Sequence, residues 1–170
     1  QLLTVAKMIE ARAQTGVKRQ IFFVSAGGYD THTGQIAGQN RLLGELSTAV
    51  KAFYDATVAL GVSNGVTTFT LSDFGRTLRA ASGGGSDHAW GNHHFIVGGA
   101  VKGGDMYGKF PTLVLSGPDD VASEGRWLPS TAVDQYGATL ANWFGVTAGD
   151  LLTVFPNLGK FATPNLGFMA

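Results

Sequence analysis

Apolar residues that recur every three or four positions predict two helices in the first third of the chain. The first covers residues 2–15 and ends at Gly16, which suits the left-handed position after a helix. The second covers residues 39–60, keeps a period of about 3.6 residues and stops at Gly61. The apolar positions of this long helix are Leu42, Leu43, Leu46, Val50, Phe53, Thr57 and Leu60.

Capping residues predict two more helices near the C-terminus. Either Ser130 or Thr131 can begin a helix that runs to about Trp143. Thr147 can cap a shorter helix that ends before Pro156. The remaining tail, residues 157–170, is predicted to be irregular.

Short runs of β-branched and aromatic residues predict strands at residues 20–25, 66–71, 95–97 and 112–115. The first run is apolar without interruption, which is typical of a strand covered on both faces in a parallel sheet. Because a long helix separates the first two runs, we expect them to be adjacent and parallel in right-handed βαβ units. The predicted fold class is therefore α/β, with a mostly parallel sheet and helices on both faces.

Glycine is concentrated between residues 78 and 92, and this stretch is predicted to be a loop shaped by its surroundings. Residues 82–86, Ser-Gly-Gly-Gly-Ser, resemble a phosphate-binding loop only in their glycine content, since the Gly-Lys-Ser or Gly-Lys-Thr ending is absent. No Gly-x-Ser-x-Gly motif identifies a serine nucleophile.

Composition narrows the class of protein. The chain has 44% hydrophobic and 14% charged residues, enough apolar material for one packed unit. Lys plus Arg and Asp plus Glu both number 12, so no net charge favours nucleic acid. The absence of cysteine excludes disulfides and thiolate-bound zinc, and no apolar run is long enough for a membrane span. Because Gln1 is not a translation start, we expect this chain to be part of a longer protein.

The polar residues that follow the predicted strands suggest a metal site. Asp30 and His32 follow the first strand, Asp73 follows the second, and Asp87 and His88 precede the third. Ligands of open α/β sheets bind outside the carboxyl ends of the strands, where such residues would meet. Imidazole and carboxylate are ligands of Zn²⁺, whereas Ca²⁺ or Mg²⁺, the alternatives, require more oxygen atoms. The competing interpretation is that these are ordinary loop residues that bind backbone groups.

Arg76 is the candidate for catalysis. Its planar guanidinium suits a tetrahedral oxyanion such as phosphate or sulfate. The alternative is a structural ion pair with Asp73 or Asp87.

Several runs are similar to the family known as domain of unknown function 1501, and the resemblance extends over nearly the whole chain. The main runs are Gly-Gly-Tyr-Asp-Thr-His at 27–32, Thr-Leu-Ser-Asp-Phe-Gly-Arg-Thr at 70–77 and Gly-Ser-Asp-His-Ala-Trp-Gly-Asn-His-His-Phe at 85–95. That family resembles the alkaline-phosphatase-like superfamily, which includes sulfatases, and this chain looks like the C-terminal half of such a protein. The resemblance implies metal-binding roles for Asp30, His32, Asp73 and His88, and export to the periplasm or secretion.

Two departures from the superfamily pattern matter. Phe74 stands where the pattern has His or Asn, so the second metal site loses a ligand unless Asp87, His93 or His94 replaces it. The nucleophile and the first metal-binding Asp belong to the N-terminal half, which this chain lacks, and we therefore expect the fragment alone to be inactive.

The resemblance implies a metal-dependent hydrolase of a phosphoric or sulfuric ester, either a small molecule or a polysaccharide. The alternative is a catalytically silent binding or assembly module of the cell envelope, which Phe74 favours. A sheet severed from its N-terminal half would expose an edge, so we expect that half, or a second copy of the chain, to cover it.

Overall fold

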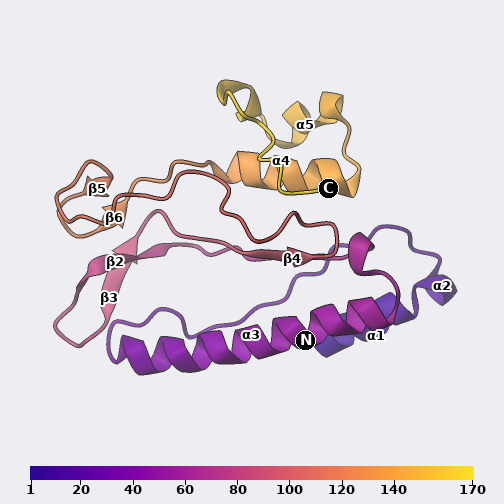
Figure 1. Cartoon of the computed structure of the whole chain (residues 1–170), viewed down its shortest axis with the longest axis horizontal. Coiled ribbons are helices and arrows are strands. Elements are labelled where there is room, and N and C mark those ends of the chain that lie inside the picture. The colour runs from indigo at the N-terminus through magenta and orange to yellow at the C-terminus, as the bar shows by residue number, and fades with distance from the viewer.

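The computed structural model describes all residues, 1–170, and shows helices on two sides of a layer of strands and extended segments (Figure 1). Helix α3 runs along one side, and helices α4 and α5 lie on the opposite side. Most of the middle layer is irregular chain, and its strands are short.

The N-terminal helices pack along α3. Helix α1 spans Leu2–Glu10, and the short α2 spans Arg12–Thr15 and ends at Gly16, which has a φ of 66°. Helix α3 spans Gln35–Ala59. The predicted first helix is thus divided at Ala11, and the predicted long helix begins four residues earlier than expected. Its glycine N-cap, Gly34, has a φ of 56° and provides no capping side chain.

The sheets are all antiparallel pairs. Strand β1 (Thr67–Phe69) pairs with β4 (Ile96–Gly98), β2 (Gly75–Ala80) pairs with β3 (Ser86–Ala89), and β5 (Asp120–Val121) pairs with β6 (Arg126–Trp127). The one-turn 3₁₀ helix η1 (Ser63–Gly65) precedes β1. The glycine-rich stretch predicted to be a loop is therefore largely the β2–β3 hairpin.

The predicted fold class is wrong. The chain contains no parallel sheet, because residues 20–25 and 112–115 form no strand, and β1 pairs with β4 in antiparallel orientation. A continuous apolar run does not by itself define a strand, since it also suits an extended segment packed on a helix. Phe22 packs in this way against the cluster formed by α1 and α3. The chain therefore does not show the alkaline-phosphatase-like fold.

The C-terminal helices follow the prediction closely. Helix α4 spans Val133–Phe144 and α5 spans Ala148–Val154. The Thr147 hydroxyl accepts a hydrogen bond from the Asp150 amide and so caps α5 as expected. After the 3₁₀ helix η2 (Leu158–Lys160), the tail returns to the middle layer, where the Lys102 amide donates to the Phe168 carbonyl.

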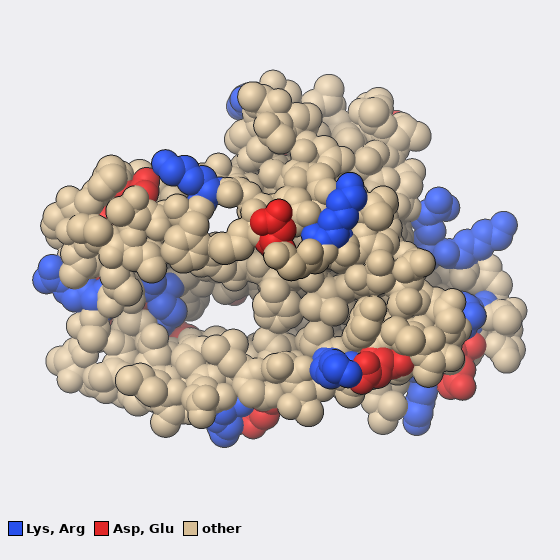
Figure 2. Space-filling view, in the orientation of Figure 1, with Lys and Arg blue, Asp and Glu red and all other residues tan.

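The buried core is small. One cluster joins Val5 and Ile9 of α1 to Phe53 of α3, and Phe168 is buried under Tyr107 and Tyr136. Charged side chains are scattered over the face seen in Figure 2 and form no single patch there. None of the helices combines the length and apolar character needed to cross a membrane.

Candidate metal site

Three predicted ligands meet at one point of the structure. Asp30 Oδ1 lies 2.9 Å from His32 Nε2 and 3.1 Å from His88 Nε2. The two imidazole nitrogens are 3.2 Å apart. The three donor atoms therefore form a nearly equilateral triangle.

This triangle matches one face of a zinc coordination sphere. Tetrahedral Zn²⁺ with bonds of about 2.0–2.2 Å separates its ligand atoms by about 3.3–3.6 Å, so each separation observed here would have to widen by about 0.1–0.7 Å. The side chains of Asp30, His32 and His88 are 51%, 50% and 52% exposed, so an ion can reach them from solvent. Three protein ligands with an open fourth position are typical of catalytic zinc sites, whereas structural sites have four. No ion is present.

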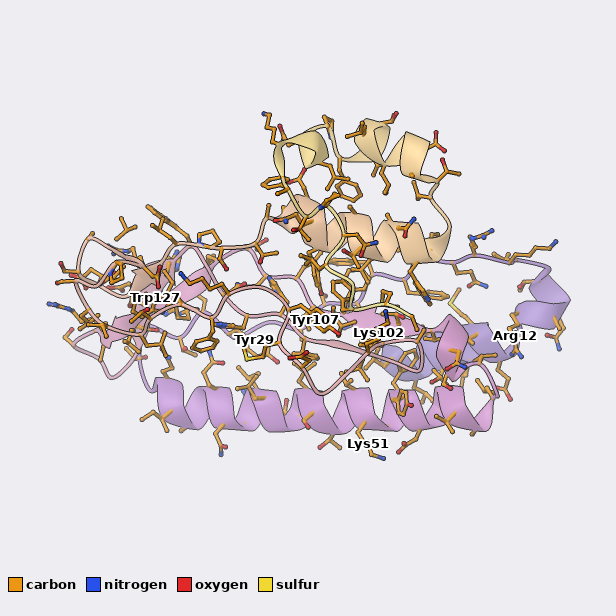
Figure 3. All side chains as sticks on the ribbon, turned by 45° about the horizontal axis from the view of Figure 1, so that its top comes forward. Arg12, Tyr29, Lys51, Lys102, Tyr107 and Trp127 are labelled. Carbon is orange, nitrogen blue, oxygen red and sulfur yellow. The ribbon has the colours of Figure 1, made fainter.

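Helix α3 positions the loop that carries Asp30 and His32. Gln39, one turn into the helix, donates from Nε2 to the Tyr29 carbonyl at 2.9 Å and to the Thr31 hydroxyl at 3.1 Å. Tyr29 lies between α3 and the strand layer in Figure 3, and its hydroxyl donates to the Leu42 carbonyl. The helix thus fixes residues on both sides of Asp30.

The β2–β3 hairpin brings His88 to the same place. Its turn is hydrogen-bonded to the loop, since the Ser86 amide donates to the Thr31 carbonyl and the Gly34 amide donates to the Gly83 carbonyl. A Cβ atom at Gly85 would overlap the backbone of Thr31 and His32. Only glycine allows the hairpin to approach the loop this closely.

Arg76 is the cross-strand partner of His88, and it binds Asp30. Its Nη1 donates to Asp30 Oδ1, while Nε and Nη2 donate to the hydroxyl and carbonyl oxygens of Ser86. The expected ion pair with Asp73 or Asp87 is therefore replaced by one with Asp30. The Arg76 side chain is only 16% exposed.

The surroundings keep Asp30 ionised. Partial desolvation raises the pKa of the Asp30 carboxyl, but hydrogen bonds from Arg76 and His88 and electrostatic interaction with His32 and His88 lower it by more. The pKa therefore lies below its ordinary value. An ionised carboxylate is the form that binds a metal ion.

Two neighbours complete the site. Asp87 Oδ1 lies 3.2 Å from His32 Nδ1, the nitrogen that faces away from Asp30. The Phe74 ring stacks on the His88 imidazole, with centroids 3.9 Å apart and an interplanar angle of 18°. From the sequence, Phe74 was seen only as the loss of a metal ligand. It lies two residues before Arg76, the cross-strand partner of His88, and this pairing explains why its ring reaches the His88 imidazole.

Asp73, His93 and His94 lie outside the group of converging ligand atoms. Asp73 is exposed in the turn before β2. The His93 ring stacks on Phe110, and the His94 ring stacks on Tyr136. Desolvation, together with neighbouring His93, lowers the pKa of His94, so it is mainly neutral at pH 7.

The model of the family described as "Protein of unknown function (DUF1501)" matches residues 4–138. This match includes most of α1, the whole of α3 and the whole candidate site. No curated protein matches the chain, and no solved structure matches it.

Proposed function

Because the chain belongs to DUF1501, a family of proteins of unknown function, we propose a function from the site itself: binding of a divalent metal ion, zinc by preference, for hydrolysis of a phosphoric or sulfuric ester. The observation that supports this proposal is the triangle of Asp30 Oδ1, His32 Nε2 and His88 Nε2. Two nitrogen donors and one oxygen donor suit zinc, whereas Ca²⁺ takes six to eight oxygen ligands.

Three protein ligands would leave one coordination position of a zinc ion free for water or substrate. When bound, a zinc ion with a free coordination position acts as a Lewis acid and lowers the pKa of a coordinated water to about 7. Asp30, His32 and His88 would hold the ion, and because their side chains are half exposed, it would remain accessible from solvent. The nucleophile is expected from the N-terminal half, so this site would supply only the metal part of the chemistry.

Arg76 supports an anionic substrate. Its guanidinium lies against Asp30 and places a positive charge beside the proposed metal position. Three of its N–H groups bind Asp30 and Ser86. A guanidinium has five N–H donors, so two remain for a phosphoryl or sulfuryl oxygen at the site.

A catalytically silent module is the second candidate, and one contact favours it. The Arg76–Asp30 ion pair already balances the charge of the carboxylate, so the cluster is electrostatically satisfied without a metal ion. In such a module the histidines would only fix the hairpin against the loop.

Zinc titration of the chain separates these candidates. We expect calorimetry to detect one Zn²⁺ per chain, and His88→Ala to abolish that binding. His93→Ala is the matched control, because this histidine lies outside the ligand group and should leave the affinity unchanged. Absence of zinc binding by the wild type, or equal loss in both variants, contradicts the proposal.

The substrate class requires a second assay. In a screen of simple monoesters, the zinc-loaded chain should hydrolyse one of the two ester classes, phosphate or sulfate, when it is tested together with the N-terminal half that is expected to supply the nucleophile, and neither class when it is tested alone. Hydrolysis should be lost in Asp30→Asn and unchanged in His93→Ala. A protein that binds zinc but hydrolyses neither class even with that half present would support the silent module.

We also propose that a second copy of the chain covers the extended segment at residues 20–24. This segment makes no backbone hydrogen bond within the chain. Ile21 and Phe23 on it are 79% and 91% exposed. An extended backbone with unpaired N–H and C=O groups readily pairs with the same segment of another chain.

A further inference from the structure

His32 uses both of its ring nitrogens. Nε2 faces Asp30 Oδ1 at 2.9 Å and His88 Nε2 at 3.2 Å, inside the proposed metal site. Nδ1 faces Asp87 Oδ1 at 3.2 Å, on the far side of the ring. The imidazole therefore lies between the site and a second carboxylate that is not part of the ligand triangle.

The Asp87 carboxylate can accept a hydrogen bond from the His32 nitrogen that faces away from the proposed metal site. An ionised carboxylate only accepts hydrogen bonds, and a neutral imidazole has one N–H group. Without a metal ion this N–H can donate either from Nε2 to Asp30 Oδ1 or from Nδ1 to Asp87 Oδ1, whereas a metal ion needs the lone pair of Nε2 and leaves the N–H on Nδ1, where Asp87 accepts it. Two lone pairs 2.9 Å apart repel each other unless a cation lies next to both.

Asp87 is itself well placed by the hairpin. It lies on β3 between Ser86 and His88, and its backbone amide donates to the Thr77 hydroxyl at 3.0 Å. Thr77 on β2 is buried. The hairpin thus positions both His88 and the carboxylate that orients His32, although these two side chains reach different sides of the imidazole.

We propose that Asp87 is a positioning residue that fixes the tautomer and ring orientation of His32 so that Nε2 binds the metal ion. This inference rests on the proposed metal site. A carboxylate that accepts from the second nitrogen of a metal-binding histidine also raises the basicity of that ligand. Removal of such a carboxylate typically weakens metal affinity by about 10- to 100-fold.

The experiment compares the zinc affinity of the wild type with Asp87→Asn, Asp87→Glu and the control Asp105→Asn. Asp105 lies in an exposed loop, and its carboxylate accepts from the amide of the next residue. We expect Asp87→Asn to weaken zinc binding by about 10- to 100-fold. Asp87→Glu should recover part of the loss, and Asp105→Asn should have no effect. Circular dichroism melts establish that each variant is folded.

A second readout follows the tautomer directly. Long-range ¹H–¹⁵N spectra of the zinc-loaded wild type should show the His32 proton on Nδ1, and Asp87→Asn should disturb that assignment. Equal affinities of the wild type and Asp87→Asn would overturn the role of Asp87 while leaving the metal site intact. Complete loss in Asp87→Asn, as in His88→Ala, would also overturn it, because Asp87 would then be a ligand. A wild type that binds no zinc would refute the proposed function itself.

Discussion

Each proposed ligand contacts one additional side chain that restricts its position. Arg76 donates to Asp30, Asp87 faces His32, and the Phe74 ring lies flat against His88. Preorganised ligands lose less conformational freedom when a metal ion binds. Phe74 therefore restricts the orientation of the His88 imidazole.

Tyr136 provides a test of the packing between α4 and the middle layer. Desolvation raises the pKa of the Tyr136 hydroxyl to about 12, and this hydroxyl donates a hydrogen bond to the Thr70 carbonyl. Spectrophotometric titration should show that one of the four tyrosines ionises near pH 12. In Tyr136→Phe this late component should disappear.

The same pKa shift predicts how stability depends on pH. Between pH 10.0 and about 12, the unfolded chain loses the Tyr136 proton while the folded chain keeps it. The stabilisation is therefore complete below pH 10 and falls as the pH rises to about 12. Urea denaturation at several pH values should show this alkaline slope in the wild type, and a smaller slope in Tyr136→Phe. Equal slopes would mean that Tyr136 is accessible to water.

At the scale of elements, the helices could be predicted from the sequence because their pattern is local. The period of about 3.6 residues and the cap at Thr147 depend only on neighbouring residues, and α3, α4 and α5 lie close to their predicted positions. Strand pairing depends on distant partners. The runs at 20–25 and 112–115 have strand composition but no partner, so their prediction failed.

The candidate site was predicted in part, but through the wrong architecture. Asp30, His32 and His88 were expected to meet at the carboxyl edge of a parallel sheet. They meet instead because the β2–β3 hairpin folds back on the loop before α3. Asp73 was also expected in the site because it follows a predicted strand. It lies in the turn before the hairpin and outside the group of converging ligand atoms. The antiparallel hairpin could not be inferred, because its turn of three glycines has no strand signal.

A substitution at Gly85 tests the close packing of the β2–β3 hairpin against the loop that carries Asp30 and His32. Alanine at this position would overlap the backbone of Thr31 and His32, so the hairpin must shift and carry His88 away from Asp30. We expect Gly85→Ala to weaken zinc binding by at least tenfold and to destabilise the fold by about 1–3 kcal/mol, as overpacking typically does. Calorimetry and urea denaturation measure the two effects.

Gly27→Ala is the matched control. Gly27 lies in the same loop, has open space where a Cβ would be, and does not require a positive φ. It should leave both zinc affinity and stability nearly unchanged. If Gly85→Ala behaves like this control, the close approach of hairpin and loop does not determine the site.

The whole molecule exposes more surface than a compact chain of its size. Its accessible surface is 10667 Å², whereas a compact monomer of 17.8 kDa exposes about 8,000 Å². Figure 2 shows openings between α3 and the strand layer, in agreement with this difference. The excess of about 2,700 Å² is enough for an extensive obligate interface, which buries 2,000–5,000 Å² in total.

The exposed segment at residues 20–24 is where we expect a second copy to bind. Ile21 and Phe23 share one face of the segment and point to solvent, while Phe22 packs on the α1–α3 cluster. Pairing of this segment with its counterpart would satisfy its free backbone groups and bury Phe23. Light scattering should therefore give a mass of twice 17.8 kDa for the chain in solution.

Phe23→Lys should convert the dimer to a monomer, because it places two like charges close together in an interface that otherwise buries apolar surface. Ile36→Lys is the control: Ile36 is 87% exposed but lies at the start of α3, outside the segment, and the same charge there should leave the dimer intact. A wild type that is monomeric at all concentrations, and that unfolds in one cooperative thermal transition, would show that the chain is self-sufficient. Its exposed apolar segment would then be stable in water without a partner.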